Sequence, residues 1–276
     1  MIKERPIGIF DSGLGGLTCA KRLMEMLPGE DIVFLGDTAR NPYGTKTKET
    51  IACYTNDNVA FLQRRNVKMI IAACGTVSSN VPIGKIQNLQ VPYVDVITPT
   101  VQKAVAATKN KRIGIIGTAA TIKSGSFNNR IKAIDKNIET VSNGCQQLVS
   151  LVEAGYIDEG NFITNSVCKE YLKPIKESGC DTLILGCTHY PVIAGIIGDL
   201  MGPSVTLIDS GRAAADHARR ILEEKELLAG RDGKGSSSFF VSDDPAQFAQ
   251  NAALFLGGQF RGRVEKVDIT AYPDTI

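Results

Sequence analysis

Several sequence features that point to special classes of protein are missing from this chain of 276 residues. Its seven cysteines include no Cys-x-x-Cys pair, which leaves little support for a zinc site or a dithiol redox site. Its longest apolar stretches have the length of a strand and fall far short of the roughly 20 residues that a membrane helix needs. The N-terminus also lacks the apolar segment of a signal peptide. We therefore expect a cytoplasmic protein that does not enter a membrane and keeps its cysteines reduced.

An excess of charge of one sign is missing as well. The chain has 31 basic and 29 acidic residues and a formal net charge of +2. Without a basic tract to hold a phosphate backbone, nucleic acid is not an expected partner. A dinucleotide-binding G-x-G-x-x-G loop is not expected at residues 13–18 either, because Thr18 stands where the pattern requires glycine. Hydrophobic residues make up 43% of the chain, as in an ordinary globular protein, and the length suits one or two domains.

Short apolar runs alternate with longer amphipathic stretches, which is typical of an α/β protein built on mainly parallel sheets. Strands are expected at residues 7–10 and 32–35, and helices beginning near residue 16 and covering 48–65 and 160–173. Ser210 and Asp244 are each expected to cap a further helix, the second because a proline follows it. The loop at residues 36–44 is too polar and too rich in turn residues to belong to the core.

A weak internal repeat indicates two similar α/β domains. Residues 7–12 resemble 113–118, residues 68–74 resemble 182–187, and residues 94–98 resemble 206–210, at offsets between 106 (7 to 113) and 113 (74 to 187). We therefore predict one domain from residues 1–97 plus 208–276 and another from 98–207. Their mainly parallel sheets are expected to face each other across an active-site cleft, with Cys74 and Cys187 in equivalent positions on its two sides.

Cys74 and Cys187 each stand where a strand is expected to end and a helix to begin. Ligands of parallel sheets bind beyond the carboxyl ends of the strands, so this is a functional location. A helix N-terminus lowers a thiol pKa from about 8.5 toward neutrality, so each group is expected to exist as thiol or thiolate near neutral pH. Thr76 and Thr188 follow closely and offer hydroxyls to a bound carboxylate. The alternative is a pair of buried cysteines without chemistry, which is how we interpret the other five.

Two facing thiols suit the racemisation of an α-carbon, which needs a base on one face and an acid on the other. Without a cofactor to spread the carbanion charge, fixed donors must stabilise it and water must be excluded. Asp11 and His189 are candidates to assist the two thiols. Asp11 ends the strand that is expected beside the strand of Cys74, and His189 stands two residues after Cys187. Judged alone, His189 is equally well explained as a hydrogen-bonded loop histidine. Further donors are expected from Ser12, Tyr43, Gly44, Thr118 and Thr121.

At these residues the chain resembles glutamate racemase, over nearly its whole length. The most specific segments are FDSGLGGLT at 10–18, GDTARNPYG at 36–44, LVEAG at 151–155 and LGCTHYP at 185–191. The resemblance implies that Cys74 and Cys187 are the two acid/base residues, acting on D-glutamate and L-glutamate respectively. It also implies that Asp11 assists Cys74, and that Glu153 and His189 assist Cys187. The substrate pocket would then be lined by Ser12, Pro42, Tyr43, Gly44, Gly75, Thr76, Thr118, Thr121 and Thr188.

The same resemblance implies two similar α/β domains, with the C-terminal segment returning to the first, and a reaction that needs neither a cofactor nor a metal. The D-glutamate formed would supply peptidoglycan synthesis, and a homodimer is expected. Two alternatives stay open. One is a related two-cysteine aspartate racemase with a shorter side-chain pocket. The other is a non-catalytic relative that binds an acidic ligand.

Gly75 is the main departure from the family, whose members usually carry Asn after the first cysteine. The missing amide is expected to cost about 1.5–3 kcal/mol for each hydrogen bond to a charged ligand. We therefore predict that Gly75→Asn lowers KM for glutamate. Phe127 replaces a common Tyr and Gln146 replaces a frequent Pro, and both changes are expected to be tolerated.

Overall fold

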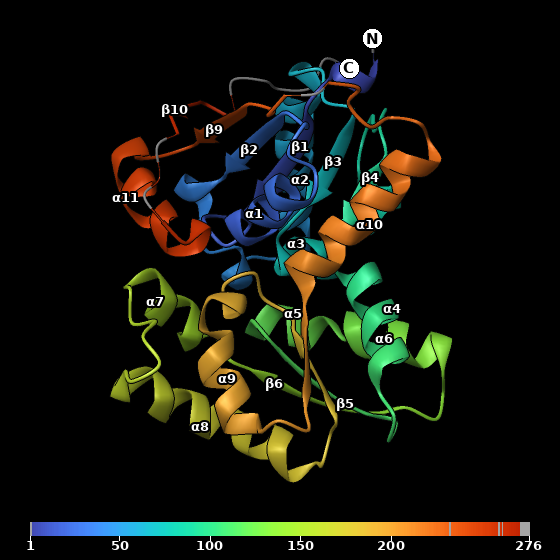
Figure 1. Ribbon diagram of the computed structural model, residues 1–276, viewed down its shortest axis with the longest axis vertical. Helices are drawn as coiled ribbons and strands as arrows, with labels where there is room; N and C mark the ends of the chain where they lie inside the picture. The colour runs from blue at the N-terminus through green and yellow to red at the C-terminus, as the bar shows by residue number, and fades with distance from the viewer. Residues whose placement is uncertain (1, 232, 259, 261, 271–276) are drawn as a thin grey trace.

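The computed structural model describes residues 2–270 apart from 232, 259 and 261, and it consists of two lobes, one above the other in Figure 1. Each lobe contains a sheet whose strands all run parallel, with helices packed around it. The first and last described segments both belong to the upper lobe.

The upper lobe contains a six-stranded sheet of order β10-β9-β2-β1-β3-β4. All residues of its central strands β1, β2 and β3 are buried, which is why these strands are continuous apolar runs in the sequence. The strands are β1 (Ile7–Asp11), β2 (Ile32–Gly36), β3 (Met69–Ala72), β4 (Tyr93–Asp95), β9 (Ser237–Val241) and β10 (Val264–Lys266). The helices are α1 (Leu17–Met26), α2 (Lys48–Arg64), α3 (Gly75–Asn80), α10 (Ser210–Glu224) and α11 (Pro245–Leu256).

The lower lobe contains a four-stranded sheet of order β6-β5-β7-β8. Its central strands β5 and β7 are almost entirely buried, whereas β6 is a partly exposed edge strand. The strands are β5 (Arg112–Gly117), β6 (Glu139–Gly144), β7 (Thr182–Leu185) and β8 (Thr206–Asp209). The helices are α4 (Ile97–Ala107), α5 (Ala119–Ser124), α6 (Ser126–Ile134), α7 (Gln147–Glu153), α8 (Phe162–Glu177) and α9 (Ala194–Met201).

The two sheets share a common strand order, as the internal repeat predicts. The order β2-β1-β3-β4 in the upper sheet corresponds to β6-β5-β7-β8 in the lower one, so β1, β3 and β4 match β5, β7 and β8. The α/β fold class with two similar lobes is therefore confirmed. The chain crosses from the upper to the lower lobe between β4 and α4, and it returns between β8 and α10. The helices α4 and α10 pack against each other.

The boundaries of the two domains follow from these crossings. The strand β8 continues past residue 207 to Asp209, so we propose that the second crossing lies between Asp209 and Ser210. We retain the boundary between residues 97 and 98 as a proposal. Of the segments assigned to the first domain, residues 1, 232, 259, 261 and 271–276 lie outside the described residues.

The predicted helix caps are correct in one case and wrong in the other. Asp244 caps α11, because its carboxylate accepts the backbone N–H of Ala246 at 2.8 Å. Ser210 is instead the first residue of α10, and Asp209 is the cap, with its carboxylate accepting the N–H of Arg212 at 3.1 Å. Asp209, at the end of β8, thus accepts a hydrogen bond from the helix N-terminus, the role that was expected of Ser210.

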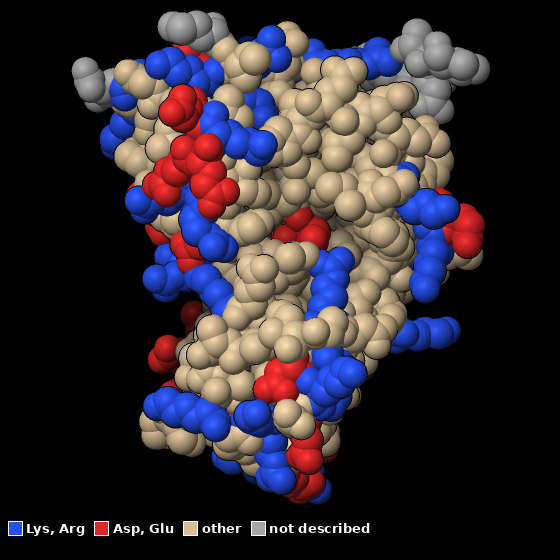
Figure 2. Space-filling model, turned by 90° about the vertical axis from the view of Figure 1, so that its right-hand side faces the viewer, with Lys and Arg blue, Asp and Glu red and all other residues tan. Residues whose placement is uncertain are grey.

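The surface agrees with the balanced composition of the chain. On the face in Figure 2, Lys and Arg side chains lie among Asp and Glu side chains over both lobes. No helix within the described ranges combines the length and the apolar character needed to cross a membrane. All seven cysteines are free. Cys53 is exposed, which contradicts its interpretation as a buried apolar residue, whereas Cys19, Cys145, Cys168 and Cys180 are buried as predicted.

Candidate active site

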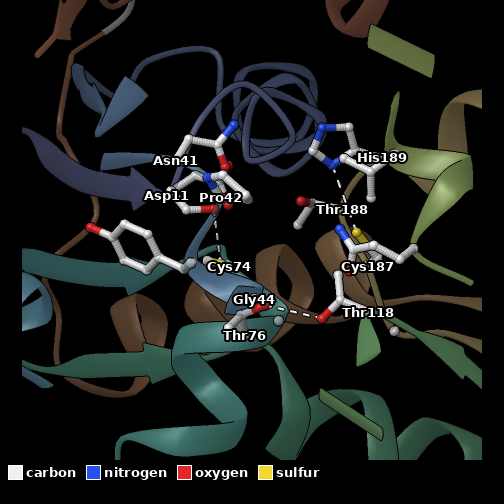
Figure 3. A pocket seen from close by; sticks show the side chains of 16 residues that line it. Asp11, Asn41, Pro42, Gly44, Cys74, Thr76, Thr118, Cys187, Thr188 and His189 are labelled. Carbon is white, nitrogen blue, oxygen red and sulfur yellow. Dashed lines mark hydrogen bonds between the residues drawn. The ribbon is translucent and has the colours of Figure 1, made fainter. Parts of the chain in front are cut away.

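A cavity of about 40 Å³ lies between the lobes, at the carboxyl ends of the strands that carry the two cysteines. The cavity therefore has room for only a few water molecules. Figure 3 shows Cys74 and Cys187 reaching the cavity from different segments of the chain. The lining consists of Asp11, Ser12, Asn41, Pro42, Tyr43, Gly44, Cys74, Gly75, Thr76, Thr118, Gln146, Val149, Gly186, Cys187, Thr188 and His189.

Cys74 is the N-cap residue of α3 and lies one residue beyond the end of β3, at the predicted passage from strand to helix. Its side chain is buried, and its sulfur lies 3.4 Å from the hydroxyl oxygen of Ser12. Burial raises the pKa of the Cys74 thiol to about 12, and the negative charge of Asp11 acts in the same direction. The expected lowering of this pKa by the helix N-terminus is therefore wrong, because desolvation outweighs the hydrogen bonds to the sulfur.

Asp11 ends β1, the strand next to β3, and its side chain is almost completely buried. One carboxylate oxygen accepts the backbone N–H of Gly13 at 3.0 Å. Burial raises the pKa of Asp11, although the charge of His189 partly offsets this effect. Ser12, rather than Asp11, is therefore the residue within hydrogen-bonding distance of the Cys74 sulfur.

Cys187 follows β7, but no helix begins at this residue. A turn leads into a short 3-10 helix, η5 (Tyr190–Ile193), and α9 begins only at Ala194. The predicted helix N-terminus at Cys187 is therefore wrong. In place of a helix N-terminus, Cys187 has the side chain of His189 beside it, with the His189 Nδ1 atom 3.7 Å from the Cys187 sulfur.

His189 links Cys187 to the carboxylate of Glu153, at the end of α7. The two heavy atoms, His189 Nε2 and Glu153 Oε1, are 2.8 Å apart. Burial lowers the pKa of His189, but hydrogen bonds to Cys187 and Glu153 and the charges of both groups outweigh it and raise the pKa to about 10. An imidazolium beside the sulfur favours negative charge on that sulfur. Of the two interpretations of His189, the structure therefore supports a role beside the thiol.

Three threonine hydroxyls form a continuous chain beside the thiols, and the chain joins the lobes. The Oγ1 atom of Thr118 lies 3.1 Å from that of Thr76 and 3.0 Å from that of Thr121. Thr76 belongs to the upper lobe and Thr118 to the lower lobe (Figure 3). Thr121 lies behind Thr118 and does not line the cavity, just as Glu153 lies behind His189. These two predicted site residues therefore contact the lining instead of forming it.

The lobes touch where glycines line the interface between them. A β-carbon at Gly75 would lie 2.4 Å from the carbonyl oxygen of Gly186, which belongs to the other lobe. At Gly15 a β-carbon would lie 2.2 Å from Thr188 Oγ1 and 2.6 Å from His189 Nδ1. The first contact contradicts the premise that an Asn side chain fits at position 75, because there is no space for its β-carbon. Of the glycines at positions 13, 15 and 16, Gly15 thus serves a close approach between the lobes.

Four lining residues were not predicted from the sequence: Asn41, Gln146, Val149 and Gly186. Asn41 precedes Pro42 in the same polar loop, which is a signal that could have identified it. Gly186 directly precedes Cys187. Gln146 is the N-cap residue of α7 and Val149 lies within this helix, which packs beside η5. Within the described ranges no group of three or more His, Cys, Asp and Glu side chains is placed to hold a metal ion.

Comparisons with known proteins place this geometry in context. The family described as Asp/Glu/Hydantoin racemase matches residues 15–218. A glutamate racemase of Geobacter metallireducens is 41% identical over 267 residues, which are 97% of this chain and 98% of that protein. A solved structure of glutamate racemase from Francisella tularensis, in complex with D-glutamate, has a TM-score of 0.88 and 37% identity, and covers 98% of this chain and 100% of that one. One from Bacillus anthracis has a TM-score of 0.91 and 33% identity, with 96% and 98% covered.

The fold is thus a two-domain α/β fold, in which two similar parallel-sheet lobes bring one buried cysteine each to a shared cavity. The comparisons agree with the family and the enzyme class that the sequence predicted. The chain belongs to the Asp/Glu/Hydantoin racemase family, and it is an amino-acid racemase.

Proposed function

We propose that the protein interconverts L-glutamate and D-glutamate by a two-base mechanism in which Cys74 and Cys187 act from opposite faces of the α-carbon. The observation that carries this proposal is that both cysteines line one cavity, one from each lobe, and that each sulfur has its own polar neighbour. Glutamate is the substrate in the names of the full-length relatives at about 40% identity, which supports this choice over aspartate.

The proposed reaction removes one proton and returns another. Starting from L-glutamate, the Cys187 thiolate takes the α-proton, and the Cys74 thiol gives its proton to the opposite face of the planar intermediate. Starting from D-glutamate, the two groups exchange roles. The assignment of Cys74 to D-glutamate and Cys187 to L-glutamate rests on the family resemblance. The charged His189, held by Glu153, stabilises the Cys187 thiolate.

Among the described residues, Cys74 has no cationic neighbour of this kind, and its pKa of about 12 suits a proton donor at neutral pH. To act as a base it needs a positive charge nearby, and the α-ammonium group of a bound substrate would supply one. We infer that Asp11 holds this ammonium group, since its carboxylate is buried beside Cys74 and charge pairing offsets the cost of its burial.

The remaining lining groups offer hydrogen bonds to the two carboxylates of glutamate. Hydroxyl donors come from Ser12, Thr76, Thr118 and Thr188, which stand in both lobes. Fixed donors in a closed cavity stabilise developing negative charge better than mobile water does. We further propose that the D-glutamate formed supplies peptidoglycan synthesis in the cytoplasm, and that the protein acts as a homodimer without cofactor or metal.

A circular-dichroism assay tests the proposed function. L-glutamate is incubated with protein dialysed against a chelator, with no cofactor added, and L-aspartate is tested in parallel. The expected result is loss of the glutamate signal to zero and a slower or absent change with aspartate. Faster turnover of aspartate would favour an aspartate racemase. Thermal stabilisation by glutamate without racemisation would favour a non-catalytic binding protein, and activity that returns only with added metal would contradict a metal-free reaction.

A further inference from the structure

We propose that Asp37 and Ser242 together are positioning residues for the substrate pocket, an inference that rests on the proposed function. Neither residue lines the cavity. Both act on the segment of residues 38–44, called here the pocket loop, which includes the short helices η2 (Thr38–Arg40) and the start of η3 (Tyr43–Thr45). The pocket loop supplies four lining residues, Asn41, Pro42, Tyr43 and Gly44.

Asp37 is a fully buried carboxylate that directly precedes the pocket loop. Its Oδ2 atom accepts hydrogen bonds from Arg40 Nε at 2.6 Å and from the Tyr43 hydroxyl. Its Oδ1 atom accepts one from the Ser242 hydroxyl at 2.9 Å. A buried carboxylate is costly unless it is paired in this manner. The conformation of the pocket loop that supplies these donors is therefore strongly favoured over alternatives that leave Asp37 unpaired.

Ser242 follows β9 and connects a segment some two hundred residues away to the same loop. Besides donating to Asp37, its hydroxyl oxygen accepts the backbone N–H of Ala39 at 2.9 Å. The next residue reinforces this link, because the N–H of Asp243 donates to Thr38 Oγ1 at 3.1 Å. Pairing of β9 with β2 places Val241 opposite Gly36, which brings Ser242 to the beginning of the loop.

Arg40 and Tyr43 of the pocket loop contact α2. Arg40 forms an ion pair with Asp57, with 2.5 Å between Nη1 and Oδ2, and its guanidinium lies 4.1 Å from the centre of the Tyr54 ring. The Tyr43 hydroxyl accepts a hydrogen bond from Asn58 Nδ2 at 3.0 Å. The hydroxyl of Tyr43 is therefore engaged in supporting the loop, and the cavity receives other parts of that residue.

The thiols are carried by other elements, since Cys74 precedes α3 and Cys187 follows β7. Loosening the pocket loop should therefore weaken substrate binding more than it slows proton transfer. If the loop occupies its binding conformation for a smaller fraction of the time, the apparent affinity falls by that fraction. The signature of this role is a rise in KM with a smaller change in kcat.

Ser242→Ala is the main test, and Ser238→Ala on the exposed face of β9 is the matched control. Because two hydrogen bonds of ordinary strength are lost, Ser242→Ala should raise KM for glutamate by about fivefold to thirtyfold, with kcat changing by less than about threefold. Ser238→Ala should match the wild type in both constants. In an Asp37→Asn background, Ser242→Ala should add less to KM than it does alone, because the two residues act through one contact.

Amide hydrogen exchange provides a readout that does not depend on activity. The N–H of Ala39 and its neighbours in the pocket loop should exchange faster in Ser242→Ala than in Ser238→Ala, while β1 and β3 stay unchanged. A Ser242→Ala protein with wild-type KM, or with unchanged exchange in the loop, would overturn the proposal. If the wild type does not racemise glutamate, the proposed function fails, and the exchange measurement still decides whether Ser242 holds the loop.

Discussion

Gly75 in the upper lobe and Gly186 in the lower lobe meet so closely that a β-carbon at position 75 would lie 2.4 Å from the Gly186 carbonyl oxygen. Gly186 cannot yield easily, because its own N–H donates to the Ile116 carbonyl oxygen at 2.7 Å and a β-carbon there would meet Phe127. The absence of a side chain at position 75 thus sets how far the lobes close over the cavity.

This contact reverses the prediction made for Gly75 from the sequence alone. Gly75→Ala and Gly75→Asn should both raise KM for glutamate and lower kcat/KM by about tenfold or more, since overpacking of this kind costs about 1–3 kcal/mol. Gly198→Ala on α9 is the control, because its β-carbon would find only an ordinary contact at 3.7 Å. Steady-state kinetics of the three variants provide the measurement. A lower KM for Gly75→Asn would show that the lobes open readily and that the lost amide matters more.

Replacing either cysteine should abolish racemisation. A serine hydroxyl has a pKa far above neutrality, so Cys74→Ser and Cys187→Ser should each lower turnover by several orders of magnitude. Each variant should still eliminate the leaving group from one enantiomer of a β-substituted glutamate analogue, because elimination needs a single proton abstraction. We expect Cys74→Ser to act on the L-analogue and Cys187→Ser on the D-analogue. Near-normal racemisation by either variant would refute the two-base mechanism, whereas opposite enantiomer preferences would refute only the assignment.

His189→Asn should impair one half-reaction and spare the other. The equilibrium constant of a racemisation is one, so kcat/KM must fall equally in both directions and cannot reveal the asymmetry. Elimination is irreversible and therefore can. We predict a loss of about a hundredfold or more for the L-analogue, because Cys187 loses the cation at 3.7 Å from its sulfur. The D-analogue, handled by Cys74 beside Ser12, should change little. Equal losses for both analogues would show that His189 acts on the whole site.

Elimination by the Cys74 thiol should depend on pH. Neutral pH is far below the Cys74 pKa of about 12, so the fraction of Cys74 present as thiolate rises about tenfold for each added pH unit. Elimination from the D-analogue should therefore increase steadily between about pH 7 and 9. His189 stays charged until pH approaches its pKa of about 10, so its own titration should not contribute to the change over the same interval. Rates measured at subsaturating D-analogue provide the test, and a rate that stays constant between about pH 7 and 9 would contradict it.

Much of the fold could be predicted from the amino-acid sequence. The buried strands are continuous apolar runs, and the repeat between residues 68–74 and 182–187 correctly predicted that β3 and β7 are equivalent strands of two similar lobes. The positions of Cys74, Cys187 and His189 followed from where strands end. These features depend on the local sequence pattern and on the general rule that ligands of parallel sheets bind at the carboxyl ends of the strands.

Only the tertiary structure decided how the groups in the cavity behave. Burial raises the pKa of Cys74, although a helix begins at the next residue, because desolvation depends on the surrounding lobes and not on local sequence. The lack of space at Gly75 arises from a carbonyl more than a hundred residues away, and Ser242 reaches Asp37 across an even longer separation. Local sequence determines which elements form, but distances between the lobes are set by the packing of segments that are remote in the chain.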